Sequence, residues 1–352
     1  MLASARRKTG RGPGSWLRKA GLLAALLAGV VLYPPSLHAQ GKVVVFTFGG
    51  TWLDYMKKDI IEPFQKETGI QVEARVFQNT MEGLAQLKAQ KNNLDVDVWA
   101  TSPIPALLAA KEGLSEPLSA ADLPNSKYLP ASLLKPEYVA WYKFFFGLVY
   151  NKAEVPGGLH SWKDLWSPAL KGKLGIPTAA YGQGKFVVLL NWLAGGTEEN
   201  ADPGFALAKT LTPSVAAYFH SDTEESKFLE SGEVPVASFM MVGDYLPLAE
   251  SGKYEFVAPE PYVPTTVDCF ALLKGKNRDN GLKFINYALG KEAQEAFAAD
   301  GAVLPINSQA AAPASLAKYA PPDSQYRYVD EGAAAAHLQG WIERWNKEIQ
   351  SQ

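Results

Sequence analysis

The side chains best suited to hold a small molecule stand at turns where a predicted strand gives way to a predicted helix. Thr51 and Trp52 follow a glycine pair after the apolar run 43–48, and Thr101 and Ser102 follow a second strand-like run. Glycine permits tight turns, hydroxyl groups form hydrogen bonds, and an indole face attracts cations. In an open α/β sheet such turns meet beyond the carboxyl ends of the strands, so we expect these four residues to line one site.

Later turns and one strand supply acidic, aromatic and amide candidates. The pattern of strand, loop and helix recurs around loops 181–185 and 240–245. Carboxylates in these segments suit a cationic nitrogen, because a hydrogen bond to a charged group is stronger than a neutral one. The candidates from this half of the chain are Tyr181, Gln183, Asp222, Met241, Asp244 and Asp268.

Several of these residues also admit a structural interpretation. Trp52 could pack the first helix against its sheet, and Asp222 and Asp244 could begin the helices that follow them. Asp268 stands in the apolar strand "VDCFALL", where a carboxylate needs a partner. A ligand ammonium group, Lys185 or backbone amides would each meet that need.

The residue types missing from the chain exclude several chemistries. No arginine occurs between Val76 and Asn277, which removes a guanidinium clamp for an anion from the site. The histidines are far apart, and the sequence has no GxSxG, P-loop or HExxH motif, so we expect no enzyme. We expect no metal and no cofactor.

The alternation of strand-like and helix-like segments predicts an α/β protein of two domains built on open sheets. Apolar runs such as 43–48 read as strands buried on both faces, and helical spacing follows the turns. Gly69 is placed to end the first helical segment, and Ser102 with Pro103 to begin a later one. The 352 residues suffice for two hydrophobic cores.

Residues 1–39 read as a secretory signal peptide, cleaved near Ala39. Six basic residues precede a short apolar run, and Pro34-Pro35 follows it. Removing the six from the chain's 34 lysines and arginines leaves 28 against 36 acidic residues, which disfavours nucleic acid as a partner. The single cysteine, Cys269, excludes an intrachain disulfide, and we expect a buried thiol.

Six segments in order resemble the extracellular solute-binding proteins of bacterial ABC importers. They are "FTFGGTW…PFQKETGI", "DVDVWATSP…LLAAKEGLSEPL", "FGLVYNKAEVP", "SWKDLWSPALKGKLGIPT", "ESGEVPVASFMMVGDY" and "GLKFINYALGKEAQEAFAADGAVLPIN". Within that family the chain is most similar to the branch of the spermidine/putrescine-binding proteins. The resemblance covers essentially everything after the signal peptide.

The resemblance implies a monomeric periplasmic receptor with a type II binding-protein fold. Its ligand would lie in a hinge cleft that closes on binding, and the closed form would deliver it to a permease in the inner membrane. The first domain would comprise 42–148 plus 270–352, and the second 149–269. The segments around "FFFGLVYNK" and "TVDCFALLKG" would connect them.

The polyamine branch also suggests roles for individual residues. Asp268 stands where those proteins place an acid that contacts a ligand ammonium group, and Trp52 and Ser102 stand at the matching first and second loops. The branch's usual aromatic before the aspartate and tryptophan in the "ASFMMVGDY" loop are absent. The resemblance therefore implies a small cationic nitrogen compound, with an amino acid-like compound, thiamine, an organic anion or a sensor role as alternatives.

Overall fold

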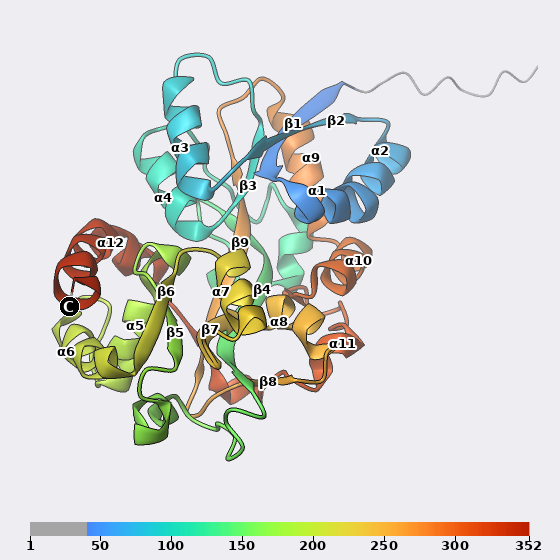
Figure 1. The fold of residues 1–352 in the computed structure, drawn as a ribbon. Coiled ribbons are helices and arrows are strands. Elements are labelled where there is room, and N and C mark those ends of the chain that lie inside the picture. Colours follow the sequence, from blue (N-terminus) through green and yellow to red (C-terminus); the bar gives the residue numbers. More distant parts are fainter. Residues whose placement is uncertain (1–40, 352) are drawn as a thin grey trace, which may run out of the picture. The chain divides into compact units, whose positions relative to one another are not determined.

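The computed structural model describes residues 41–351, drawn as a coloured ribbon in Figure 1. The predicted signal peptide, residues 1–39, lies outside the described residues. Among residues 41–351, no helix has the length and apolar character needed to cross a membrane.

Eleven strands and twelve α-helices alternate along the described chain. The strands are β1 (Lys42–Phe48), β2 (Gln71–Phe77), β3 (Val98–Thr101), β4 (Val139–Asn151), β5 (Leu174–Pro177), β6 (Val215–Phe219), β7 (Val236–Met241), β8 (Tyr254–Val257), β9 (Val263–Leu272), β10 (Leu304–Pro305) and β11 (Tyr326–Tyr328). The helices are α1 (Gly50–Met56), α2 (Glu62–Thr68), α3 (Thr80–Ala89), α4 (Pro103–Lys111), α5 (Lys185–Leu193), α6 (Asp202–Leu211), α7 (Asp222–Ser231), α8 (Val242–Ala249), α9 (Arg278–Ala288), α10 (Lys291–Gly301), α11 (Ala314–Ala317) and α12 (Glu331–Trp345). This order confirms the predicted α/β class.

The strands follow the order β2-β1-β3-β9-β4-β7-β5-β6, with β8, β10 and β11 beside this path. β1 is parallel to β2 and β3, and β5 is parallel to β6 and β7. The long strand β4 joins the two parallel groups, because residues 139–145 pair with β9 and residues 146–151 pair with β7 and β8. The two parallel groups are therefore connected through β4 and β9, which run through the middle of Figure 1.

Alternate residues of β1 enter two different cores. Val43 and Val45 pack in one core with α1, α2 and α9, whereas Val44 and Phe46 pack in another with α3 and α4. A strand with helices on both faces must be apolar at every position, since successive side chains point to opposite faces. Figure 1 shows α3 and α4 on one side of β1 to β3 and α1, α2 and α9 on the other.

Several local predictions at element ends are confirmed. Gly69 ends α2 with a left-handed φ of 72°, which glycine adopts without the steric cost of a Cβ atom. Ser102 is the N-cap of α4 with Pro103 at its first position. The Cys269 thiol is buried, as expected.

The C-terminal helix α12 contributes to the core around α5 and α6. The Trp345 ring meets Phe186 and Phe205 edge-on, and Trp341 and Leu338 belong to the same buried cluster. The predicted domain division assigns α12 to the first domain by its place in the chain. The division at 42–148 plus 270–352 and 149–269 stays a prediction, because the described residues form one compact unit.

Asp97, immediately before β3, fastens three distant segments together. Its carboxylate accepts hydrogen bonds from the Val44 amide at 2.7 Å and from the Asn277 amide and side chain at 2.8 and 2.9 Å. The residue is 1% exposed. Removing this carboxylate would leave one buried and two partly buried donors without partners, and each unsatisfied donor is costly.

We expect Asp97→Ala to lower the free energy of unfolding by about 3 kcal/mol. Urea denaturation measures this as a lower midpoint at an unchanged slope. Asp95→Ala is the matched control: Asp95 pairs with Arg75 at the surface, and its side chain is 42% exposed, so its loss should cost less than about 1 kcal/mol. Equal losses from the two variants would contradict the role given to Asp97.

Candidate functional site

A pocket of about 200 Å³ lies beside the two long strands, and we call it the central pocket. Its lining comes from β1, α3, the start of α4, β4, the loop before α5, α7, β7 and β9. The lining residues are Phe48, Thr80, Ser102, Phe144, Phe146, Tyr181, Gly182, Gln183, Lys185, Asp222, Met241, Thr266 and Asp268. Segments far apart in the sequence therefore converge on one small volume.

Six of the ten predicted site residues line this pocket: Ser102, Tyr181, Gln183, Asp222, Met241 and Asp268. The other four lie elsewhere. Thr51 is exposed on α1, Thr101 is fully buried in β3, and Asp244 is partly buried in the first turn of α8. Trp52 packs its ring against Tyr142 and Phe297.

The loop that carries Tyr181 and Gln183 depends on an unusual backbone. Gly182, Gln183 and Gly184 all have positive φ, at 62°, 56° and 79°. Glycine suits the two flanking positions, and Gln183 is a non-glycine residue in a region it rarely adopts. At Gly184 a Cβ atom would also lie 2.8 Å from the Trp341 ring, so the helix α12 and this loop fix each other.

Gln183 bridges the pocket from the loop before α5 toward α3 and the start of α4. Its amide nitrogen donates to the Ser102 hydroxyl at 2.7 Å and to the Thr80 hydroxyl at 3.3 Å. Its carbonyl oxygen is buried without a hydrogen-bond partner among the described residues. Ser102 makes no side-chain cap bond to α4, so its hydroxyl serves the pocket instead.

Asp268 is the carboxylate that β9 presents to the pocket. The Tyr142 hydroxyl donates a hydrogen bond to its Oδ2. Burial raises the pKa of Asp268 to about 7, although the Tyr142 hydroxyl and the nearby Lys185 both favour its charged form. Trp52 meets Tyr142 edge-on, so it holds the ring that orients Asp268.

A second group of carboxylates lies at the α7 and α8 side of the pocket. Asp222 accepts a hydrogen bond from the Tyr181 hydroxyl, and burial raises its pKa. Behind it, Glu225 is fully buried, and neither of its oxygens has a hydrogen-bond partner within residues 41–351. Burial and the neighbouring acids raise the pKa values of Glu225 and Asp244 well above the usual range.

Lys185 brings positive charge to the pocket, and its partner is Glu331. Its ammonium nitrogen lies 3.5 Å from Glu331 Oε2, and both side chains are more than nine-tenths buried. The other oxygen of Glu331 accepts from the Thr266 hydroxyl at 2.7 Å. The positive charge of Lys185 is thus balanced by Glu331 rather than by the pocket's aspartates.

Three important residues were not predicted from the sequence: Tyr142, Glu225 and Glu331. Glu225 follows Asp222 by three positions, so helical spacing alone could have placed both on one face of α7. Tyr142 and Glu331 gave no local signal, since each reaches its partner across more than a hundred residues of chain.

Comparison with known proteins gives the same family as the resemblance did. A spermidine/putrescine-binding periplasmic protein of Haemophilus influenzae is 28% identical over 260 residues, covering 70% of this chain and 71% of the relative. A putrescine-binding periplasmic protein of Escherichia coli is 28% identical over 307 residues, covering 78% and 79%.

The fold agrees with that of solved transport proteins. The structure of an ABC transporter protein from Clostridium perfringens superposes with a TM-score of 0.77 at 23% identity, covering 87% of this chain and 99% of the other. The expected type II periplasmic binding-protein fold is confirmed. Residues 59–321 match the bacterial extracellular solute-binding proteins, and the chain belongs to that family.

Proposed function

We propose that this protein captures a small organic cation with primary ammonium groups, polyamine-like, in the central pocket. It then delivers the cation to the permease of an ABC transporter in the inner membrane, working as a monomer in the periplasm. The relatives named for spermidine and putrescine support this ligand class.

The observation that carries the proposal is the surplus of buried carboxylate around the pocket. Asp222 and Asp268 line it, and Asp222 lies close enough to Glu225 and Asp244 to raise the pKa values of both. The one lysine of the lining is paired with Glu331. Buried carboxylates without cations are costly, and a ligand ammonium group would supply the missing charge and hydrogen-bond donors.

Gln183 adds a means of coupling the ligand to closure of the cleft. Its amide nitrogen already bonds Ser102 and Thr80, while its carbonyl oxygen stays free to accept from a ligand N–H. A bound ammonium group would therefore strengthen a bridge between the loop before α5 and the start of α4. Closure by hinging is the motion that two-domain receptors use.

The other predicted residues lie around these contacts and support them or extend them. Trp52 holds Tyr142 against Asp268, and Asp244 adds a further carboxyl group near Asp222. Thr51, exposed just after β1, stays a proposed contact for a ligand larger than the pocket, and Thr101, the buried last residue of β3, would support Ser102 beside it. The cation is thus held by Asp268, Asp222, Tyr181, Gln183 and Ser102, with Met241 as apolar wall.

Asp268→Asn should weaken putrescine binding by about ten- to a hundredfold, because it removes one charged hydrogen-bond acceptor at nearly constant shape. Isothermal titration calorimetry on the purified protein measures this change. Asp279→Asn, whose side chain is 88% exposed on α9, is the matched control and should bind as the wild type does. Unchanged or tighter binding by Asp268→Asn would overturn the cationic ligand.

The same variant should make the ligand-free protein more stable at pH 8. A carboxyl group with a raised folded-state pKa is disfavoured in the fold once it ionises, so its cost grows as pH rises from about 4 to 7. Asn avoids that cost. We therefore expect the free energy of unfolding at pH 8 to rise by about 1–3 kcal/mol, after allowing for the partial exposure of Asp268 to the pocket. Urea denaturation at pH 5 and pH 8 tests this, since the gain should shrink at pH 5. A loss of stability at pH 8 would indicate a structural role.

Putrescine affinity should rise with pH across neutrality. Asp268 must be ionised to pair with an ammonium group, and its pKa of about 7 leaves it mostly protonated at pH 6. The affinity at pH 8 should therefore exceed that at pH 6 by about tenfold or more. Calorimetry across this range measures it, and Asp268→Asn should flatten the profile. Equal affinities at both pH values in the wild type would contradict the assignment.

A further inference from the structure

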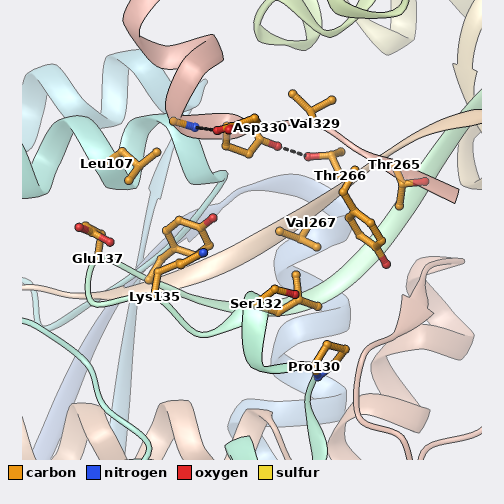
Figure 2. Close-up of a pocket in the computed structure, with 15 residues that line it drawn as sticks. Leu107, Pro130, Ser132, Lys135, Glu137, Thr265, Thr266, Val267, Val329 and Asp330 are labelled. Atoms are coloured by element: carbon orange, nitrogen blue, oxygen red, sulfur yellow. Dashed lines mark hydrogen bonds between the residues drawn. The ribbon is translucent and has the colours of Figure 1, made fainter. Parts of the chain in front are cut away.

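A second and larger cavity, of about 470 Å³, lies along β9 and the start of α12. Figure 2 shows it between Leu107 of α4, the segment before β4 with Lys135 and Glu137, and the start of α12 at Asp330. We call it the β9–α12 cavity. Thr266 lines both this cavity and the central pocket, so the two spaces adjoin at this residue.

The lining of the β9–α12 cavity is acidic and aromatic. Glu137, Asp330 and Glu331 supply three carboxylates against the single Lys135. Within residues 41–351, neither Glu137 nor Asp330 has a lysine, arginine or histidine within 4 Å. Tyr138, 7% exposed, adds a ring face and a hydroxyl for which the described residues show no hydrogen bond.

This combination selects one class of ligand. Carboxylates attract a positive charge, and a tyrosine face attracts a cation whose charge is spread over apolar groups. Val267, Leu107 and Val329 complete an apolar wall that suits methyl or methylene groups. We propose that the β9–α12 cavity is a second binding site, for a small organic ammonium ion, and that its occupancy opposes cation binding in the central pocket.

Occupancy of the β9–α12 cavity should weaken cation binding in the central pocket because one ion pair connects the two. Glu331 lines the β9–α12 cavity, Lys185 lines the central pocket, and their charged atoms lie 3.5 Å apart. A cation in the cavity offsets part of the negative charge of Glu331 through space, since Glu331 Oε2 itself is buried. The charge of Lys185 then acts on the central pocket with less compensation, and a cation there binds more weakly. Such coupling is reciprocal, so a cation in the central pocket also weakens binding in the cavity.

The site itself is tested with tetramethylammonium chloride, against sodium chloride at equal ionic strength. This ion has no N–H donor, so it cannot make the hydrogen bonds that the aspartates of the central pocket offer. Calorimetry should show saturable binding to the wild type. The isosteric double variant Glu137→Gln/Asp330→Asn should weaken it about three- to tenfold, and Asn keeps the helix cap. Thermal unfolding confirms that the double variant folds.

Two matched variants serve as controls: one should tighten tetramethylammonium binding and the other should leave it unchanged. Lys135→Gln removes the cavity's own positive charge and should tighten tetramethylammonium binding, whereas Asp222→Asn in the central pocket should leave it unchanged. Binding that is lost in Asp222→Asn and kept in the double variant would overturn the cavity as the site. No saturable binding to the wild type would overturn it as well.

The coupling rests on the proposed cation in the central pocket and is tested with both probes. Saturating tetramethylammonium should weaken putrescine binding about fivefold in the wild type, and Glu137→Gln/Asp330→Asn should need about three- to tenfold more tetramethylammonium to reach half of that effect. An undiminished putrescine affinity in the wild type would overturn the coupling. A protein that binds tetramethylammonium in the cavity and no putrescine would refute the proposed function and leave the second site standing.

Discussion

The site depends on one constraint: carboxylates are buried around the central pocket in larger number than cations. Glu225 is fully buried with neither oxygen hydrogen-bonded within the described chain, and Asp268 titrates near neutrality because of its burial. Each such group costs stability in the empty protein, since water or a cation is the partner it lacks. A fold tolerates this cost where binding recovers it, and functional sites are where stability is commonly sacrificed.

The scaffold makes that arrangement possible by keeping the surroundings rigid. β4 and β9 pair along much of their length and carry Phe144, Phe146 and Asp268 into the pocket at fixed register. Tyr142, held by Trp52 and Phe297, orients Asp268, and Gly184 against Trp341 fixes the loop that carries Gln183. Polar groups are therefore positioned by aromatic packing, which leaves their remaining hydrogen-bonding capacity for a ligand.

The sequence predicted the features that depend on neighbouring residues and missed the contacts between distant segments of the chain. Strands and helices from β1 to α5 were identified because apolar spacing, glycine ends and the Ser102-Pro103 start depend on neighbouring residues. Five of the six predicted residues that line the pocket stand at or beside strand-to-helix turns, which converge in an α/β sheet, whereas Asp268 lies within β9 and was predicted from the family resemblance. Trp52 packs on Tyr142, and Lys185 pairs with Glu331. Each contact joins chain segments far apart, so no local periodicity in the sequence predicts it.

In the proposed function, the partner of Lys185 decides which ligand charge the central pocket suits. Had Lys185 paired with Asp268, the two charges would cancel and the pocket would suit a neutral ligand. Instead Glu331, in the first turn of α12, lies 3.5 Å from the lysine and is itself held by the Thr266 hydroxyl. A carboxylate is favoured at a helix N-terminus, so α12 stabilises the acid that occupies the lysine. The selectivity of a pocket built from β9, α5 and α7 therefore rests in part on a helix that begins more than 140 residues after Lys185 and contributes no atom to the pocket lining.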